Sequence, residues 1–333
     1  MSVTDVAHYM EVLMAIMSRA SSGLLLAIAS TITFALSGAF VKPLLESGWT
    51  PGSAVIARVL IAGVVLSPFA AVALRGRWRT LWTGRRRIIG FGLIPVAATQ
   101  LAYFAAIARI PIGMALLIEY LAPVLLVLLA WARTRSVPPA AVIVGSVLAL
   151  GGLVLVIGPG VAGPIDLLGV LFAATAAIGL AAYFLIAAMP DDGVPPVALA
   201  ASGLLLGGVA LLVLGLVGIV PLGATFGTVD LLGATVAWWI PLGVVALLAT
   251  AVAYATGIAA TARLGSRLAS FVGLLEVAFA ALFAWILLGE ALSPLQLLGG
   301  VLIIAGIAFV RAERGADAVS PESERMTTSA EPA

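Results

Sequence analysis

The sequence has 333 residues, of which 63% are hydrophobic and 10% are charged, and its mean hydropathy is +1.22. Soluble domains carry about 25% charged residues, so this composition excludes a soluble fold and predicts an integral membrane protein. Its net charge is only +2, and its arginines are placed as in membrane topology rather than nucleic-acid binding. The sequence contains no cysteine, and its one histidine, His8, precedes the first apolar run. Thiolate chemistry and a histidine-based metal site in the membrane are therefore excluded.

Ten apolar runs are long enough to cross a hydrocarbon core of about 30 Å. Short connections rich in glycine and proline separate them. The runs cover residues 22–42, 52–74, 88–108, 111–131, 138–158, 166–188, 195–219, 237–260, 267–288 and 294–311. The sequence therefore predicts an all-α polytopic membrane protein with ten transmembrane helices.

The two ends of the chain differ from these runs in composition. Residues 1–21 are interpreted as a cytoplasmic N-terminal leader, because Asp5, Glu11 and Arg19 do not form the basic start of a signal peptide. Residues 312–333 are polar and rich in Ser, Thr, Glu and Pro, which predicts a disordered cytoplasmic tail.

Residues 103–157 share a pattern with residues 254–310. The matched pairs are Tyr103 and Tyr254, Trp131 and Trp285, Pro139 and Pro294, Gly145 and Gly300, and Gly151 and Gly306. A few single-residue insertions account for the small drift in their offset. The chain is therefore predicted to contain two five-helix repeats, at residues 22–158 and 159–311.

The basic residues predict the orientation of these repeats. Of the 17 lysine and arginine residues, all except Lys42, Arg58 and Arg109 lie on the cytoplasmic side if the N-terminus is placed there. Both termini are then cytoplasmic. Because five crossings are an odd number, the second repeat is inverted relative to the first. Inverted repeats are typical of secondary transporters, whose substrate site lies between the two halves.

The segment Leu287-Leu288-Gly289-Glu290-Ala291-Leu292-Ser293-Pro294, followed by Gly299-Gly300, resembles the repeat-ending motif of the EamA family of the drug/metabolite transporter superfamily. The resemblance covers about residues 22–311 and includes Arg58 in the second span. Ile110-Pro111-Ile112-Gly113 and Ile118-Glu119-Tyr120-Leu121-Ala122-Pro123 look most like the threonine/homoserine exporter branch. Leu274-Leu275-Glu276 fits the same branch. The resemblance implies a transporter that exports amino acids and other small metabolites.

Two departures from the family pattern stand out. The first repeat has Thr134-Arg135 where the second has Gly289-Glu290. Val277 follows the span-nine glutamate where the family usually has a proline, which would kink the helix and free a carbonyl. This second departure affects the expected geometry around Glu276.

Three ionisable side chains, Arg58, Glu119 and Glu276, lie inside predicted spans, where a charge is costly. They are candidates for binding substrate or coupling protons, and the alternative is that they join helices or reach an interface. The residue aligned with Glu276 is Ala122, which shares a helix face with Glu119. The two carboxylates are therefore expected to converge. For Arg58, near the outer surface, a structural role is the stronger alternative.

Uncharged polar residues within the spans extend this candidate site, and they are Gln100, Tyr103, Tyr183 and Tyr254. A tyrosine ring with one hydroxyl suits a small zwitterionic substrate, but the same groups also form interhelical hydrogen bonds. Glycines at equivalent places in spans five and ten predict that these helices pack together, as a scaffold or a dimer interface.

The predicted function is a secondary transporter, without cofactor, metal or catalytic residues, that exports amino acids or related compounds by alternating access. Its expected partners are a small-molecule substrate, protons as candidate coupling ions, and the lipid bilayer, but not nucleic acid. It is expected to be a multi-pass protein of the inner or plasma cell membrane, as a monomer or homodimer. A membrane-embedded enzyme acting on lipid-linked substrates and a channel are the alternatives. The sequence contains no phosphate-binding loop with a lysine, which argues against an ATP-driven pump.

Overall fold

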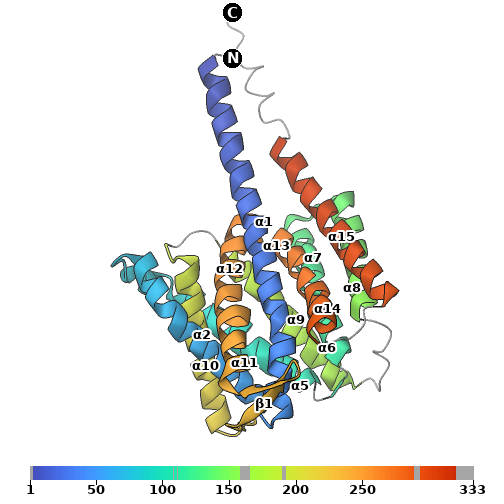
Figure 1. The fold of residues 1–333 in the computed structure, drawn as a ribbon. Helices are drawn as coiled ribbons and strands as arrows, with labels where there is room; N and C mark the ends of the chain where they lie inside the picture. The colour runs from blue at the N-terminus through green and yellow to red at the C-terminus, as the bar shows by residue number, and fades with distance from the viewer. Residues whose placement is uncertain are drawn as a thin grey trace, which may run out of the picture.

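The computed structural model describes residues 3–107, 109–110, 112–157, 166–189, 193–288 and 293–319. It is a mostly helical bundle (Figure 1) in which ten helices of the described part are long and apolar enough to cross a membrane. The prediction of ten spans is therefore confirmed. Each span boundary in the structure lies within a few residues of the predicted one.

The first five spans consist of eight helical elements, and a short helix connects the second span to the third. They are α1 (Val3–Glu46), α2 (Pro51–Leu74), the connecting α3 (Arg79–Thr83), α4 (Arg85–Phe91), η1 (Gly92–Ala98), α5 (Thr99–Ile107), α6 (Ile112–Glu119), α7 (Ala122–Thr134) and α8 (Ala140–Ile157). Span three is formed by α4, η1 and α5 in succession, and span four is broken between α6 and α7.

The second five spans repeat this organisation. They are α9 (Leu167–Ala187), α10 (Pro196–Leu216), α11 (Trp239–Ala246), η3 (Leu247–Val252), α12 (Ala253–Leu264), α13 (Ser266–Gly273), α14 (Leu275–Leu288) and α15 (Pro294–Val319). Helix α15 continues beyond residue 312, where the tail was expected to begin. Residues 320–333 of that tail, and residues 289–292 of the repeat-ending motif, lie outside the described residues.

A short hairpin between α10 and α11 is the exception to the predicted all-α fold. Its strands, β1 (Thr228–Leu231) and β2 (Ala234–Ala237), pair antiparallel, and the turn residues Leu232 and Gly233 both have positive φ. Two positive φ angles in a two-residue turn are typical of a tight hairpin. Val229 of β1 packs against Leu44 and Trp49, which anchors the hairpin to the end of α1.

The elements η1 and η3 are π-helical segments at equivalent places in the two repeats. A buried threonine bonds back across each one. The Thr99 hydroxyl donates to the Ile94 carbonyl at 2.9 Å, and the Thr250 hydroxyl donates to the Val245 carbonyl at 2.8 Å. In both cases the acceptor lies five residues earlier in the chain. Such bulges often occur at functional sites.

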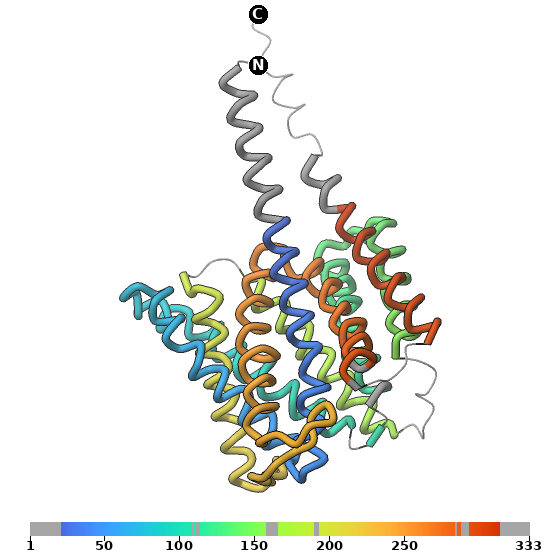
Figure 2. Tube along the Cα trace, in the orientation of Figure 1, coloured from blue at the N-terminus to red at the C-terminus, as the bar shows by residue number. Residues whose placement is uncertain are grey.

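The two repeats interlock along their lengths, since most extensive helix contacts join one repeat to the other. The pairs are α2 with α10, α8 with α15, α1 with α12, and α5 with α9. In Figure 2, the red α15 lies beside the green α8 at one edge of the bundle. The prediction that spans five and ten pack together is confirmed within one chain.

Candidate functional site

A cavity of about 300 Å³ lies inside the bundle, between the two repeats. Its walls come from spans one, two, three, four, six, eight and nine. None of its described lining residues belongs to α8, α10 or α15. The cavity volume falls at the small end of the range of small-molecule sites. A compact ligand is therefore the kind that fits.

All the predicted site residues line this one cavity. They are Arg58, Gln100, Tyr103, Glu119, Tyr183, Tyr254 and Glu276. They lie on six different spans, so the fold brings together side chains that are far apart in the sequence. The expected convergence of Glu119 and Glu276 is present in the structure.

Arg58 lies in the second turn of α2 and faces the cavity. Its Nη1 donates a hydrogen bond to the Ser37 hydroxyl at 3.0 Å, which ties α2 to α1. Its Nε is buried and has no hydrogen-bond partner among the described residues. A guanidinium offers five N–H donors, and because the Arg58 side chain lines the cavity, donors that reach the cavity can bind an anionic group there.

Glu119 lies at the break in span four, as the last residue of α6. Pro123, four residues later, is the second residue of α7 and also lines the cavity. Because proline has no N–H, the Glu119 carbonyl loses the bond that residue 123 would donate. The break therefore leaves this carbonyl without its usual helical bond, in a residue that lines the cavity.

Glu276 lies at the matching break in span nine, in the first turn of α14. The N–H of Val277 donates to the Leu274 carbonyl at 3.2 Å, three residues back rather than the four of an α-helix. The helix is therefore interrupted here even though the usual proline is absent. Tyr120, on the facing break, lines the same cavity as Glu276.

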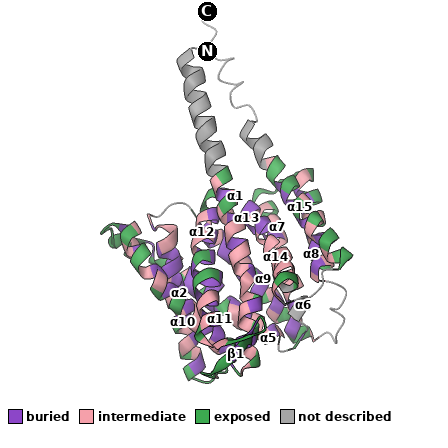
Figure 3. Cartoon of the chain, viewed as in Figure 1, coloured by how far each residue is buried: buried purple, intermediate pink, exposed green. Residues whose placement is uncertain are grey.

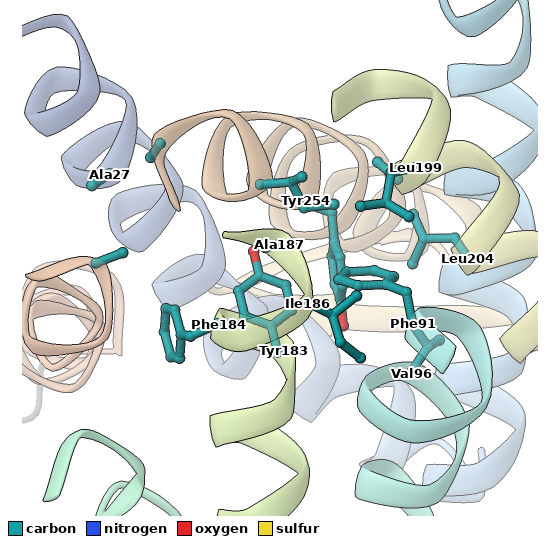
Figure 4. Packing of buried hydrophobic residues seen from close by; sticks show 14 of the residues in the cluster. Ala27, Phe91, Val96, Tyr183, Phe184, Ile186, Ala187, Leu199, Leu204 and Tyr254 are labelled. Carbon is teal, nitrogen blue, oxygen red and sulfur yellow. The ribbon is translucent and has the colours of Figure 1, made fainter. Parts of the chain in front are cut away.

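An aromatic cluster lies beside the cavity, and Figure 4 shows its members Tyr183, Tyr254 and Phe91 packed together. The ring centroids of Tyr183 and Tyr254 are 5.9 Å apart, and Phe91 lies 5.5 Å from Tyr183 behind them. Phe34 packs edge-on against Tyr254 at 5.2 Å. Gly257 makes room for this cluster, since a Cβ there would lie 2.6 Å from the Tyr183 hydroxyl oxygen.

The charged groups outside the cavity are paired differently. Arg109 forms a salt bridge with Asp166 at 3.2 Å, and Arg267 forms one with Glu313 at 3.0 Å. Asp166 also caps α9, and the bond from the Leu168 N–H, with help from Arg109, holds the pKa of its carboxyl below the usual value. In the described part of the chain, none of the three charged residues of the cavity forms a salt bridge.

Several polar lining residues were not predicted, and they are Ser30, Thr31, Ser37, Thr99, Tyr120, Thr261 and Ser270. One of them carried a visible sequence signal. Ala98-Thr99 and Ala102-Tyr103 in the first repeat match Ala249-Thr250 and Ala253-Tyr254 in the second. This pattern marks the π-helical segments and places a tyrosine one turn beyond each buried threonine.

Comparison with known proteins adds to this geometry. The model of the EamA-like transporter family matches the chain twice, at residues 21–158 and 167–312. A protein of known crystal structure superposes with a TM-score of 0.70 at 19% sequence identity, covering 86% of this chain and 96% of that chain. At this identity the similarity shows the fold alone. No curated protein matches the sequence.

Proposed function

Since the chain belongs to the EamA-like transporter family, and is therefore a multi-pass membrane transporter, we propose that it exports an amino acid or a related small zwitterion. In this proposal it is a secondary transporter of the cell membrane, with both termini in the cytoplasm. The motifs around Glu119 and Glu276 favour the threonine/homoserine exporter branch. The proposed repeats are residues 22–158 and 159–311.

The observation that carries the proposal is the presence of opposite charges around one small cavity. Arg58 supplies a cation, and Glu119 and Glu276 supply carboxylates from the two broken spans. A zwitterion satisfies both sides at once, because its carboxylate can bind the guanidinium and its ammonium can bind a carboxylate. Charged groups inside a membrane protein are costly unless such partners are present.

The tyrosines supply the remaining contacts in this proposal. Tyr103, Tyr183 and Tyr254, with the amide of Gln100, offer hydrogen bonds beside apolar ring surface. This mixture suits a substrate with a polar head and a short apolar side chain. Either carboxylate can also carry a proton when substrate is absent, which makes protons the candidate coupling ion.

Alternating access is the proposed mechanism. Spans four and nine are both interrupted next to the cavity, and spans three and eight both contain a π-helical segment. Such interruptions are places where a helix can bend without losing all its hydrogen bonds. Exchange of conformation between the inverted repeats would then open the cavity to either side.

The proposal is tested with purified protein in liposomes loaded with labelled amino acids, with and without a pH gradient. Wild-type protein should release a small set of zwitterions in a saturable manner. Glu119→Gln and Glu276→Gln should each reduce the flux at least about 10-fold, the equivalent of about 1.4 kcal/mol. A response of the wild-type flux to the gradient would identify protons as the coupling ion.

The matched control is Glu46→Gln, which removes an exposed carboxylate at the end of α1, away from the cavity. This variant should transport like the wild type. Normal flux in both cavity variants would rule out the proposed role of the carboxylates. Flux that does not saturate with substrate would indicate a channel instead.

A further inference from the structure

The segment from the end of α2 into the first turn of α4, residues 75–87, is the most strongly basic segment of the chain. It contains Arg75, Arg77, Arg79, Arg85, Arg86 and Arg87 and no acidic residue. All of these except Arg87 are exposed (Figure 3). The segment lies at the end of α2, at the edge of the bundle to the left in Figure 1.

Two tryptophans accompany these arginines. Trp78 precedes the short helix α3 as its N-cap and Trp82 lies on it, four residues later, and their exposed fractions are 56% and 71%. The guanidinium carbon of Arg85 lies 4.9 Å from the centre of the Trp82 ring. Exposed tryptophan next to arginine is the combination found where protein meets lipid headgroups.

The segment is held in a fixed position on the bundle. The Arg87 side chain donates to the Ile186 and Ala187 carbonyls at 2.9 and 3.0 Å, at the end of α9. At the other end, Arg75 adopts a left-handed conformation that caps α2. The exposed arginines therefore lie on a segment that is anchored to the bundle at both ends.

From this arrangement we propose that residues 75–86 bind the headgroups of anionic phospholipids in the adjoining leaflet. The exposed arginines bind lipid phosphates, for which the planar guanidinium is well suited. Trp78 and Trp82 lie at the boundary between headgroups and acyl chains, beside the bound lipid. The charge complementarity of a basic surface next to a transmembrane helix favours anionic over neutral lipid.

Membrane topology alone does not require this arrangement. The bias of basic residues toward one side is satisfied by arginines anywhere in the short loops. Here they are concentrated in one segment, fixed to the bundle and combined with two exposed tryptophans. A site for a particular lipid class accounts for all three features together.

The test is native mass spectrometry of the full-length protein in detergent with added phosphatidylglycerol or phosphatidylcholine. Two variants address the segment: the triple change Arg75→Gln, Arg79→Gln and Arg86→Gln, and the double change Trp78→Ala and Trp82→Ala. Each should lower the bound phosphatidylglycerol about 5-fold or more and leave phosphatidylcholine unchanged. Because they alter different side chains, a folding defect in one leaves the other informative.

The control removes three exposed arginines from other helix ends on the same side of the bundle, through Arg133→Gln, Arg263→Gln and Arg311→Gln. It has the same net charge as the triple variant and should retain phosphatidylglycerol within about 2-fold. Equal loss in the control, or no loss in either segment variant, would overturn the proposal. Displacement of the lipid by inorganic phosphate alone would show a simple anion site instead. The readout is lipid binding and does not depend on transport.

Discussion

Two regions of the molecule differ in how they use the internal repeat. The contact between α8 and α15 keeps the symmetry of the repeat, whereas the central cavity departs from it. At the contact, both copies use glycine in the same way, but the equivalent glycines are Gly145 with Gly299 and Gly152 with Gly306. The matching of Gly145 with Gly300 and of Gly151 with Gly306 was therefore wrong by one residue, since a Cβ on Gly151 or Gly300 meets nothing within 4 Å. A Cβ on Gly152 would lie 2.5 Å from the Gly299 carbonyl oxygen, and a Cβ on Gly299 would lie 2.5 Å from that of Gly152. Gly145 and Gly306 make the same reciprocal approach at 2.7 and 2.5 Å.

The cavity uses the two copies differently. Glu119 ends α6, whereas Glu276 begins the helix after the break, and a proline follows only the first of them. The α8–α15 pair contributes no described residue to the cavity lining. The comparison teaches that the frame retains the symmetry of the repeat, whereas the chemistry of the site comes from positions where the repeats differ.

The largest expected effect is on transport, through a change to Arg58 in the asymmetric cavity. Arg58→Gln keeps a polar group near Ser37 but removes the charge. Hydrogen bonds to charged groups contribute about 1.5–3 kcal/mol, so the flux at low substrate concentration should fall about 10–100-fold. The flux of Arg58→Lys should lie between those of the wild type and of Arg58→Gln. Counterflow in proteoliposomes gives the measurement.

The control for this prediction is Arg109→Gln, which breaks the exposed pair with Asp166 outside the cavity. It should change the flux less than about 2-fold, since exposed salt bridges contribute little. The substrate provides a second check. If Arg58→Gln reduces the transport of an amine that lacks a carboxylate as much as it reduces the transport of the amino acid, Arg58 does not bind the carboxylate.

The next effect is on the symmetric frame. Gly152→Ala places a methyl group against the Gly299 backbone, where the helices must separate to accept it. Overpacking of this kind costs about 1–3 kcal/mol, and the melting temperature in detergent should fall clearly. Gly151→Ala is the matched control, because a Cβ there meets nothing within 4 Å. Equal melting of the two variants would mean that the helix contact is not tight.

A smaller effect, on the KM for substrate, is expected at Gly257, where the packing of α12 shapes the cavity wall. Gly257→Ala would place a Cβ 2.6 Å from the Tyr183 hydroxyl oxygen and 2.7 Å from that of Ser30. Displacing one hydrogen-bonding group costs about 0.5–1.5 kcal/mol, so the KM for substrate should rise about 2–10-fold. Gly243→Ala, at a position with open space, is the control. An unchanged KM would show that the Tyr183 hydroxyl does not contact substrate.

The comparison also explains what the sequence could and could not predict. The number of spans follows from hydropathy, and the pairing of α8 with α15 follows from the glycines in both helices. Both signals can be read from the sequence of each helix by itself. Arg58, Glu119 and Glu276 were found because a charge in a long apolar run is conspicuous. Ser30 and Thr261 were not, since their hydroxyls look the same whether they face a cavity or bond their own helix, as that of Thr261 also does at 2.8 Å.

The interruption of span nine was the least predictable feature, because its usual proline is replaced by Val277. The reverse change, Val277→Pro, has the smallest predicted effect and gives the sharpest test of the asymmetry. Val277 is the third residue of α14, where proline is tolerated, and only the 3.2 Å bond to Leu274 is lost. Val277→Pro should therefore cost less than about 1.5 kcal/mol and keep the flux within a few-fold.

Ala281→Pro, one turn later in the same helix, is the control, and it should cost about 3 kcal/mol or more because it lies in the helix interior. Melting temperature and flux are measured for both variants. If Val277→Pro is as damaging as Ala281→Pro, the Val277 N–H holds the break in place. The two repeats would then use different means to place their carboxylates. If Val277→Pro is tolerated, the backbone of both breaks is equivalent, and the asymmetry of the site lies in its side chains.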